Sequence, residues 1–272
     1  MVISDNLINL DVSSYQGEIL HHDKRYLFRA ARSEDAWDLS RLYSSVAVDK
    51  ENYEDKLNSG PADFSKTGGM FIIHDGNSIR DEMKRRRSFF LTIFDTDGHA
   101  AVMLKISQTD SAFVPFLNSR VMFSGYEAEC ENAHAAAENG RLIFAREIIA
   151  RKSGLPRPVK LMFYTAFHVL RDMGYTHSLG EIYKVLEYGD NKSLRYSGLL
   201  NERSFRAVTG AGALHIGANL TRRVTLNNTN ISVCIEPQIV YFDLERVIPV
   251  LKWNLAGLGA FVSFAGGGSA YF

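Results

Sequence analysis

The sequence has 272 residues, of which 46% are hydrophobic and 23% are charged, and its formal net charge is zero. This length and composition describe an ordinary globular protein with room for a substantial core. Because the charges balance, no overall field attracts nucleic acid or an anionic membrane, and we expect no nucleic-acid partner.

The two cysteines, Cys130 and Cys234, are too few for a disulfide framework. Neither has a second Cys or His at the spacing of a metal site, so no metal is expected. Residues 1–14 are polar and lack the apolar core of a signal peptide. We therefore expect a cytoplasmic protein.

The first predicted elements are a strand, a turn and an amphipathic helix. Residues 26–31 alternate in polarity as a strand does. Ser33 then resembles a helix N-cap, and apolar side chains recur at helical spacing up to Val46. A second, shorter helix is predicted from Glu51 to Leu57.

A β-hairpin is predicted next. Two apolar segments, residues 88–94 and 100–106, flank the turn residues Asp95-Thr96-Asp97-Gly98. The basic run Lys84-Arg85-Arg86-Arg87 directly precedes the first of these strands. It forms either a solvated loop or a contact with an anion.

Residues 107–140 are interpreted as an insertion. This segment contains a predicted strand near 120–123 and an Ala/Glu-rich helix over 127–138. Its apolar side chains, among them Phe113 and Phe116, either pack under a long loop or form the wall of a groove for a fatty chain.

A long central strand is predicted over residues 142–150. It continues through the loop 151–158 into a helix over 159–173, which Gly174 closes. The remaining predicted elements are a helix over 191–203 and strands over 177–185, near 205–208 and across 231–244.

No repeat or low-complexity linker divides the chain. We expect an N-terminal extension over 1–25, one domain over 26–246 with its insertion at 107–140, and an apolar, Gly-rich tail over 247–272. From Trp253 onward the tail has no charge, and its glycines make a poor membrane-spanning helix. The tail packs on its own domain or on a second copy of the chain, or it makes a weak membrane contact.

This order of elements resembles the GNAT superfamily of N-acyltransferases. Three segments carry the resemblance: FRAARSEDAWDLSRLY, EIIARKSGLPRPVKLMFYTAFHVLRDMGYTH and NKSLRYSGLLNERSFRAV. It covers about residues 26–244, with 107–140 unmatched. The resemblance implies an α/β (α+β) fold with a mixed, mostly antiparallel sheet flanked by helices, whose splayed central strands hold an acyl-thioester.

The resemblance places the acyl donor at the loop after the central strand. The family's loop reads Arg or Gln, two residues, Gly, one residue, then Gly or Ala. Arg151 and Gly154 fit, but Pro156 replaces the last small residue and has no N–H to offer. A strand, Gly loop and helix still present N–H groups and a positive helix end to a phosphate, unless the segment is only a basic surface connection. The residues expected to bind acyl-CoA or acyl-phosphopantetheine are Ile149, Arg151, Lys152, Ser153, Gly154, Arg157 and Asn191.

Amine acylation needs a base for the amine, a stabilised oxyanion and a proton for the leaving thiolate. The resemblance suggests Glu147 as the base, although this carboxylate could instead pair with Arg146 or Arg141. It suggests Tyr196, in the expected helix over 191–203, as the acid. Tyr188 or a merely packed tyrosine are the alternatives, and Asn191 either bonds the pantetheine arm or caps its helix.

The expected activity is acyl transfer from acyl-CoA or acyl carrier protein to a small-molecule amine. Within the superfamily, the imperfect loop and the insertion resemble the N-acyl amino acid synthases and acyl-homoserine-lactone synthases, which implies a long acyl chain and a carrier-protein donor. The alternative is a non-catalytic binding or assembly protein that keeps the same fold.

Overall fold

The computed structural model describes residues 12, 15–46, 74–85, 88–108, 121–190, 193–225 and 232–272. The predicted helix over 51–57 and the apolar residues of the insertion before 121 lie outside this part. The described helices are α1 (Ala36–Ser44), α4 (Gly76–Lys84), α6 (Glu127–Glu138), α7 (Pro158–Asp172), α8 (Glu202–Thr209) and α9 (Leu244–Leu255), and Ser33–Asp35 form a short 3-10 turn before α1.

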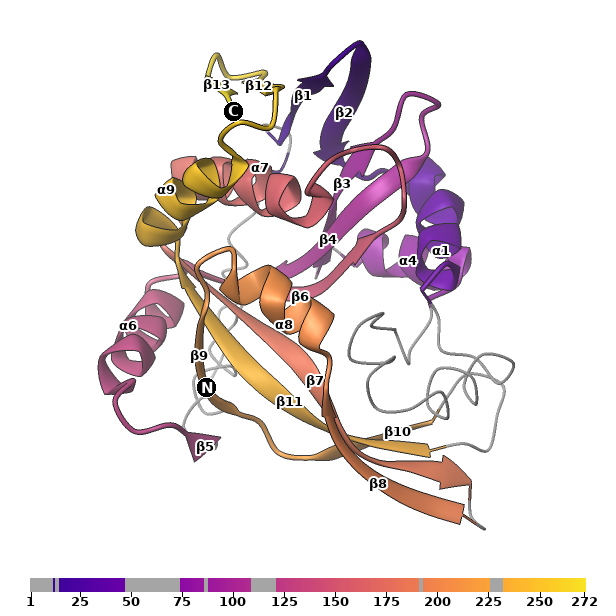
Figure 1. Cartoon of the computed structure of the whole chain (residues 1–272), viewed down its shortest axis with the longest axis vertical. Helices are drawn as coiled ribbons and strands as arrows, with labels where there is room; N and C mark the ends of the chain where they lie inside the picture. The colour runs from indigo at the N-terminus through magenta and orange to yellow at the C-terminus, as the bar shows by residue number, and fades with distance from the viewer. Residues whose placement is uncertain are drawn as a thin grey trace.

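All described strands belong to one sheet. They are β1 (Gln16–His21), β2 (Lys24–Ala30), β3 (Ser88–Phe94), β4 (Ala100–Gln108), β5 (Val121–Met122), β6 (Leu142–Ala150), β7 (His177–Asp190), β8 (Ser193–Leu200), β9 (Leu214–Ala218), β10 (Arg222–Thr225), β11 (Ser232–Asp243), β12 (Ala260–Phe264) and β13 (Ser269–Tyr271). Their order is β13-β12-β1-β2-β3-β4-β6-β7-β11-β9-β5, with β10 on β11 and β8 on β7 (Figure 1). All pairings between the described strands are antiparallel except that of β6 with β7. The predicted fold class, a mostly antiparallel sheet flanked by helices, is therefore confirmed.

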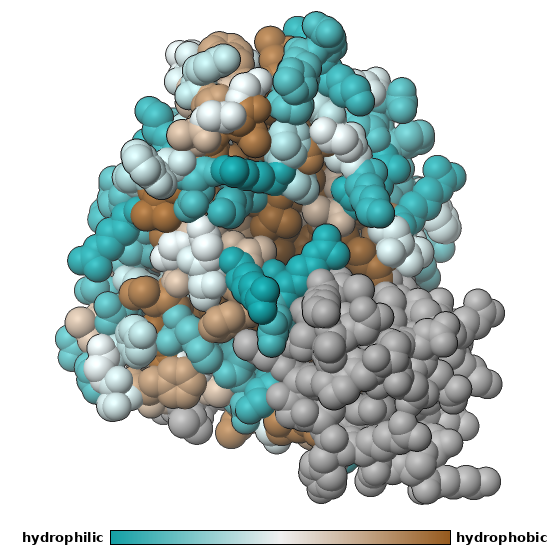
Figure 2. Space-filling view, viewed as in Figure 1, coloured by the Kyte–Doolittle hydropathy of each residue, from teal (hydrophilic) through white to brown (hydrophobic). Residues whose placement is uncertain are grey.

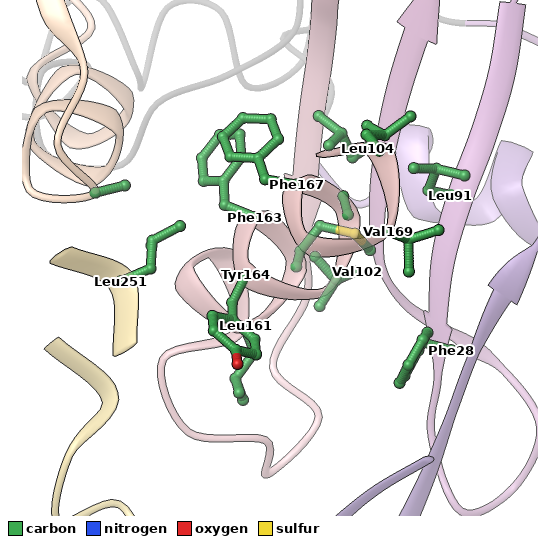
Figure 3. Close-up of a cluster of buried hydrophobic side chains, with 14 of the residues drawn as sticks. Phe28, Leu91, Val102, Leu104, Leu161, Phe163, Tyr164, Phe167, Val169 and Leu251 are labelled. Carbon is green, nitrogen blue, oxygen red and sulfur yellow. The ribbon is translucent and has the colours of Figure 1, made fainter. Parts of the chain in front are cut away.

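One face of the sheet packs on α7 and α9, which lie side by side (Figure 1). The apolar side chains of α7, such as Phe163 and Phe167, meet Val102 and Leu104 of the sheet, and Leu251 of α9 closes the cluster (Figure 3). These positions recur every three or four residues along α7 and every second residue along β4, as an amphipathic helix on a sheet requires.

The opposite face is covered in two places. Helices α1 and α4 pack on β3, β4 and the end of β6, with Leu39 and Met103 in the shared core. Helix α6 packs on the start of β6 and on β7, β9 and β11, where Ala133 meets Leu179.

The predicted hairpin is confirmed as β3 and β4, and the predicted central strand as β6. The helix predicted over 159–173 corresponds to α7, and the helix predicted over 127–138 is α6. Residues 16–21, which the sequence analysis assigned to an N-terminal extension, form β1 and pair with both β2 and β12. The apolar tail packs on its own chain, because β12 joins the sheet and Phe272 is 4% exposed.

Two predictions near residue 200 were wrong. Residues 193–200 form strand β8, which pairs with the outer half of β7, and not a helix. Residues 205–208 lie in α8 and not in a strand. Asn201 is the N-cap of α8, and its side chain accepts a hydrogen bond from the Ser204 N–H at 3.1 Å. Pairing with a strand partner outweighed the weak helical pattern, in which Gly198 already disfavours a helix.

Candidate functional site

The centre of the site is an opening between the parallel strands β6 and β7. They pair only from Leu142 with His177 to Ala145 with Gly180. Beyond these residues β6 stays with β4, whereas β7 follows β11 and β8. A Cβ on Gly180 would lie 3.1 Å from the Ala145 carbonyl oxygen, so glycine permits the closest approach of the strands just before they separate. The predicted splay of the central strands is therefore present.

The edge of β6 presents backbone N–H groups to this opening. The Arg151 N–H donates to the Ala101 carbonyl at 3.0 Å. In an antiparallel ladder alternate residues bond the same partner, so Ile149 also bonds β4. The N–H groups that point toward the opening are therefore those of Ile148 and Ala150, and not that of Ile149 itself.

The loop from β6 to α7 has the shape of an anion-binding turn. Gly154 has φ +75°, a conformation that favours glycine, and Tyr26 donates a hydrogen bond to the Ser153 carbonyl at 3.3 Å. Among the described residues, the N–H groups of 152–155 donate to no backbone carbonyl. The Ser153 Oγ is buried and has no hydrogen-bond partner there. The loop thus has unused donors beside the positive end of α7.

Some charged residues of the loop are already paired within the protein, whereas others are available to a ligand. Arg151 forms an ion pair with Asp95, and the Arg157 guanidinium donates to the Asn254 carbonyl. Lys152 is exposed. The sequence analysis did not include Lys24, whose Nζ lies 3.4 Å from the position of a Cβ on Gly154. The positive charges best placed for a phosphate are therefore Lys24 and Lys152.

Glu147 lies at the centre of a buried polar cluster. Tyr43 donates a hydrogen bond to its Oε2, and His74 Nε2 lies 3.8 Å from Oε1. The Lys105 Nζ is 3.8 Å from the same oxygen and 2.9 Å from Glu82 Oε2. Neither Arg141 nor Arg146 forms an ion pair with Glu147 among the described residues. The Glu147 side chain is 14% exposed.

A β-bulge directs Glu147 toward this cluster. Lys105 pairs with Glu147 and Ile106 with Ala145, so Arg146 is the extra residue on β6. Before the bulge Ala145 faces α7, and after it Ile148 does, whereas Glu147 faces α1.

The surroundings keep Glu147 ionised. Burial raises its pKa, but the contact with His74, the Lys105 charge and the hydrogen bond from Tyr43 together outweigh burial, so the pKa lies below its ordinary value. Burial and the nearby Glu147 charge raise the pKa of Tyr43, which therefore remains a donor. A carboxylate in this state can accept the proton that an amine nitrogen loses once the nitrogen attacks a carbonyl carbon.

The opposite wall of the opening comes from β7. Glu181 and Tyr183 alternate with Ile182, which packs toward α7, so both lie on the same face of the sheet as Glu147. Burial is the main cause of the raised pKa of Tyr183, and the charges of Glu181 and Glu147 add to it. The two strands therefore contribute polar groups to one shared space.

The remaining predicted site residues are placed differently. Tyr196 lies in β8, where its backbone pairs with Glu187, and not in a helix. Tyr188 pairs with Arg195 through the backbone. Asn191 lies outside the described residues. His168 of α7, which is no part of this predicted site, stacks on Phe264 with ring centroids 4.7 Å apart. The proposed acid role of Tyr196 stays a prediction.

The view of Figure 2 shows the face that carries α7 and α8. Apolar residues lie deep in the middle of this face, between α7 and α8, and hydrophilic residues surround them.

Among the residues that the structure describes, no group of three or more His, Cys, Asp or Glu side chains is arranged to hold a metal ion. None of the described helices combines the length and the apolar composition that are needed to cross a membrane.

No protein-family model matches the sequence, and no curated protein matches it either. Among solved structures, the chain is similar to RimJ of Mycobacterium smegmatis in complex with CoA-disulfide, with 12% identity, 90% of this chain and 94% of that chain covered, and a TM-score of 0.45. It is also similar to the spermidine N-acetyltransferase of Vibrio cholerae in complex with CoA and spermine, with 7% identity, 82% and 98% covered, and a TM-score of 0.44. At such low identities and TM-scores, the function of this chain has to be inferred from its own residues.

Proposed function

We propose that the protein is an N-acyltransferase that moves an acyl group from a thioester to an amine. The observation that carries this proposal is the separation of β6 from β7 beyond Ala145 and Gly180. It leaves the N–H groups of Ile148 and Ala150 facing an opening, with the ionised Glu147 carboxylate on the adjoining face. An extended amide-containing arm can bond to such an edge as an additional strand would.

The donor in this proposal is acyl-CoA or acyl-phosphopantetheine. Its phosphates lie at the loop before α7, where Lys24, Lys152 and the unused N–H groups supply charge and hydrogen bonds. The unpartnered Ser153 Oγ supplies one more polar contact. Gly154, Arg157 and Asn191 remain part of this proposed donor site, and Arg151 contributes only after it leaves Asp95. The role expected for Ile149 passes in this proposal to the N–H groups of its neighbours Ile148 and Ala150.

The reaction needs no covalent enzyme intermediate. The free amine nitrogen attacks the thioester carbonyl, and the developing oxyanion takes a hydrogen bond from an N–H group on the β6 edge. Glu147 accepts the proton that the nitrogen loses as the new C–N bond forms. The C–S bond then breaks, and the thiolate takes a proton, for which Tyr196 remains the proposed donor.

The deciding experiment tests the acyl donor and the catalytic base in one assay. Release of free CoA from acetyl-, octanoyl- and palmitoyl-CoA is measured with a thiol reagent against a panel of amines. In the active combination, Glu147→Gln should lower kcat by roughly 10²–10⁴. The loss of rate should shrink at high pH, where hydroxide can accept this proton in place of Glu147. Full activity of this variant at neutral pH would refute the role of Glu147 as the base.

The acyl chain and the donor form are finer proposals. Pro156 removes one N–H from the loop, and Arg151 is already paired, so the loop offers less to CoA than the full glycine pattern does. We propose a chain longer than acetyl, delivered by acyl carrier protein, as in the N-acyl amino acid synthases that the sequence resembles. A rate that peaks with acetyl-CoA would contradict this.

A non-catalytic binding protein is the second candidate, favoured by the paired state of Arg151 and Arg157. Thermal-shift measurements with acyl-CoA, combined with the turnover assay, separate the two, because a ligand of the native state raises the melting temperature by mass action whether or not it reacts. Binding without turnover by any donor and amine would favour the non-catalytic protein.

A further inference from the structure

His74 lies directly before α4 and beside the Glu147 carboxylate. Its Nε2 is 3.8 Å from Glu147 Oε1, and its ring meets the Tyr43 ring edge-on, with centroids 5.1 Å apart. Asp75 is the N-cap of α4 and accepts a hydrogen bond from the Ser78 N–H at 2.7 Å, which fixes the backbone next to His74. The imidazole is therefore held beside the proposed base, and a small rotation of the side chain or one bridging water completes the contact.

The proposed reaction removes two protons from an acceptor that arrives as an ammonium ion. One proton must leave before the nitrogen can attack, and the second leaves as the C–N bond forms. The Glu147 carboxylate can hold only one proton at a time, and its lowered pKa makes it a poor place for the first proton to stay. A second acceptor beside Glu147 allows this one carboxylate to serve both steps.

Among the described groups that contact Glu147, only His74 can take the first proton. Tyr43 keeps its own proton, because burial and the nearby Glu147 charge raise its pKa. Lys105 is held as a cation at 2.9 Å from Glu82 and 3.8 Å from Glu147, so its nitrogen has no lone pair to offer. A neutral imidazole has such a lone pair, and histidine is the side chain that ordinarily titrates near neutral pH.

The other titratable or charged groups around this cluster do not compete for the proton. Arg146 on β6 is a permanent cation, and burial raises the pKa of Tyr183 on β7. The Glu82 carboxylate of α4 is paired with Lys105. The His74 side chain is 23% exposed, against 14% for that of Glu147, so the imidazole can pass a proton on to solvent more readily than the carboxylate can.

Resting on the proposed N-acyltransferase function, we infer that His74 accepts the first proton from Glu147 and releases it to solvent. This proton passes from the ammonium nitrogen to Glu147 and on to the imidazole. Glu147 takes the second proton as the nitrogen attacks the thioester carbon and the C–S bond breaks. Of the two protons, one balances the proton that the thiolate gains and the other leaves as H⁺. His74 acts through Glu147 and does not touch the acceptor.

The test is the pH dependence of kcat/KM in the CoA-release assay, with the amine and the acyl-CoA that give the highest rate. His74→Gln keeps a polar side chain but cannot accept a proton near neutral pH. We expect it to lower kcat/KM by roughly 10- to 100-fold at neutral pH, at or below the lower end of the range for a general base, because Glu147 remains. The loss should vanish once the pH is high enough for the amine to be free in solution. Glu147→Gln should still be slower there, because the second proton still has to leave.

Two comparisons assign the effect to proton transfer. Free imidazole added to the assay should restore part of the rate of His74→Gln and leave the native enzyme unchanged. His99→Gln is the matched control, because His99 Nδ1 also lies beside a carboxylate, 3.3 Å from Asp38 Oδ1 on α1, and this variant should keep the native rate at every pH. His74→Asn is assayed in parallel, so that a folding defect of one variant does not decide the result.

The outcomes separate the two proposals. A His74→Gln variant as fast as the native enzyme at neutral pH, or one slowed equally at every pH, would overturn the proton transfer to His74 and leave the acyltransferase standing. No acylation of any amine by any acyl-CoA or by acyl carrier protein would overturn both. A loss confined to the pH range of the ammonium form would establish the inference, because a purely structural histidine has no reason to depend on the charge of the acceptor.

Discussion

Replacing Lys105 with methionine removes the cation from the centre of the carboxylate cluster and keeps most of the apolar length of the side chain. Lys105 is 3% exposed and lies 2.9 Å from Glu82 and 3.8 Å from Glu147. Two unit charges about 4 Å apart interact by ~4 kcal/mol at an effective dielectric constant of ~20. Removing one partner of a buried pair costs about 3–5 kcal/mol. We expect Lys105→Met to lower the free energy of unfolding by a similar amount at neutral pH.

This loss should depend on pH. In the native protein, burial raises the pKa of Glu147, but the contacts with His74 and Lys105 lower this pKa by more than burial raises it. The pKa in the folded state therefore lies below the value in the unfolded state. The ionised carboxylate therefore stabilises the fold above the unfolded pKa, and this stability is lost as the pH falls through the folded pKa. In the variant without Lys105, one of the contacts that lower the pKa of Glu147 is lost while burial still raises it, so this pKa should rise. The difference between native protein and variant should then be largest at neutral pH and shrink in acid.

Urea unfolding followed by circular dichroism at several pH values measures this difference. Lys152→Met, at an exposed lysine, is the control and should change stability little. The double variant K105M/E147Q should be more stable than Lys105→Met alone, since it no longer buries an uncompensated carboxylate. A loss that is equal at every pH, or a double variant that is the sum of the single ones, would refute the assigned charge network.

Three further changes test single contacts. Tyr43→Phe removes a hydrogen bond to the buried Glu147 carboxylate and should cost about 1.5–3 kcal/mol in urea unfolding, whereas a neutral result would show that another donor replaces the hydroxyl. Gly154→Ala places a Cβ at φ +75° and should cost about 1 kcal/mol and weaken CoA binding, and unchanged affinity in calorimetry would remove the phosphates from this loop. Asp95→Asn releases Arg151 and should tighten CoA binding, so an unaltered dissociation constant would mean that Arg151 does not reach the donor.

Much of the fold could be predicted because its longest elements have strong patterns. The helix α7 has an uninterrupted apolar stripe and a closing Gly174, and the β3–β4 hairpin has a turn of the right composition. The helix predicted over 191–203 was wrong because a short amphipathic pattern is compatible with both a helix and a strand. The outer half of β7, which does not pair with β6, offers a partner for a strand, and β8 forms there.

The candidate site was predicted only in part. Glu147 was predicted, but its neighbours Tyr43, His74 and Lys105 were not. These three residues come from other parts of the chain, and their spacing in the sequence does not show that they contact Glu147. Lys105 did carry a signal, since it is the one charge in the apolar strand segment 100–106. A lysine at such a position needs a buried partner, which points to a carboxylate on a neighbouring strand.

The extra residue at Arg146 sets the side of the sheet on which chemistry can occur. In a regular strand every second side chain points the same way, so without the bulge Glu147 would share the α7 side with Ala145 and be directed into the apolar core. Up to Ala145 the alternation of side chains places apolar residues in the core under α7. The one-residue shift after Ala145 places the Glu147 carboxylate on the opposite face. In a regular strand of the same sequence, Arg146 and not Glu147 would lie opposite Lys105, so the buried lysine would meet a second cation in place of the carboxylate.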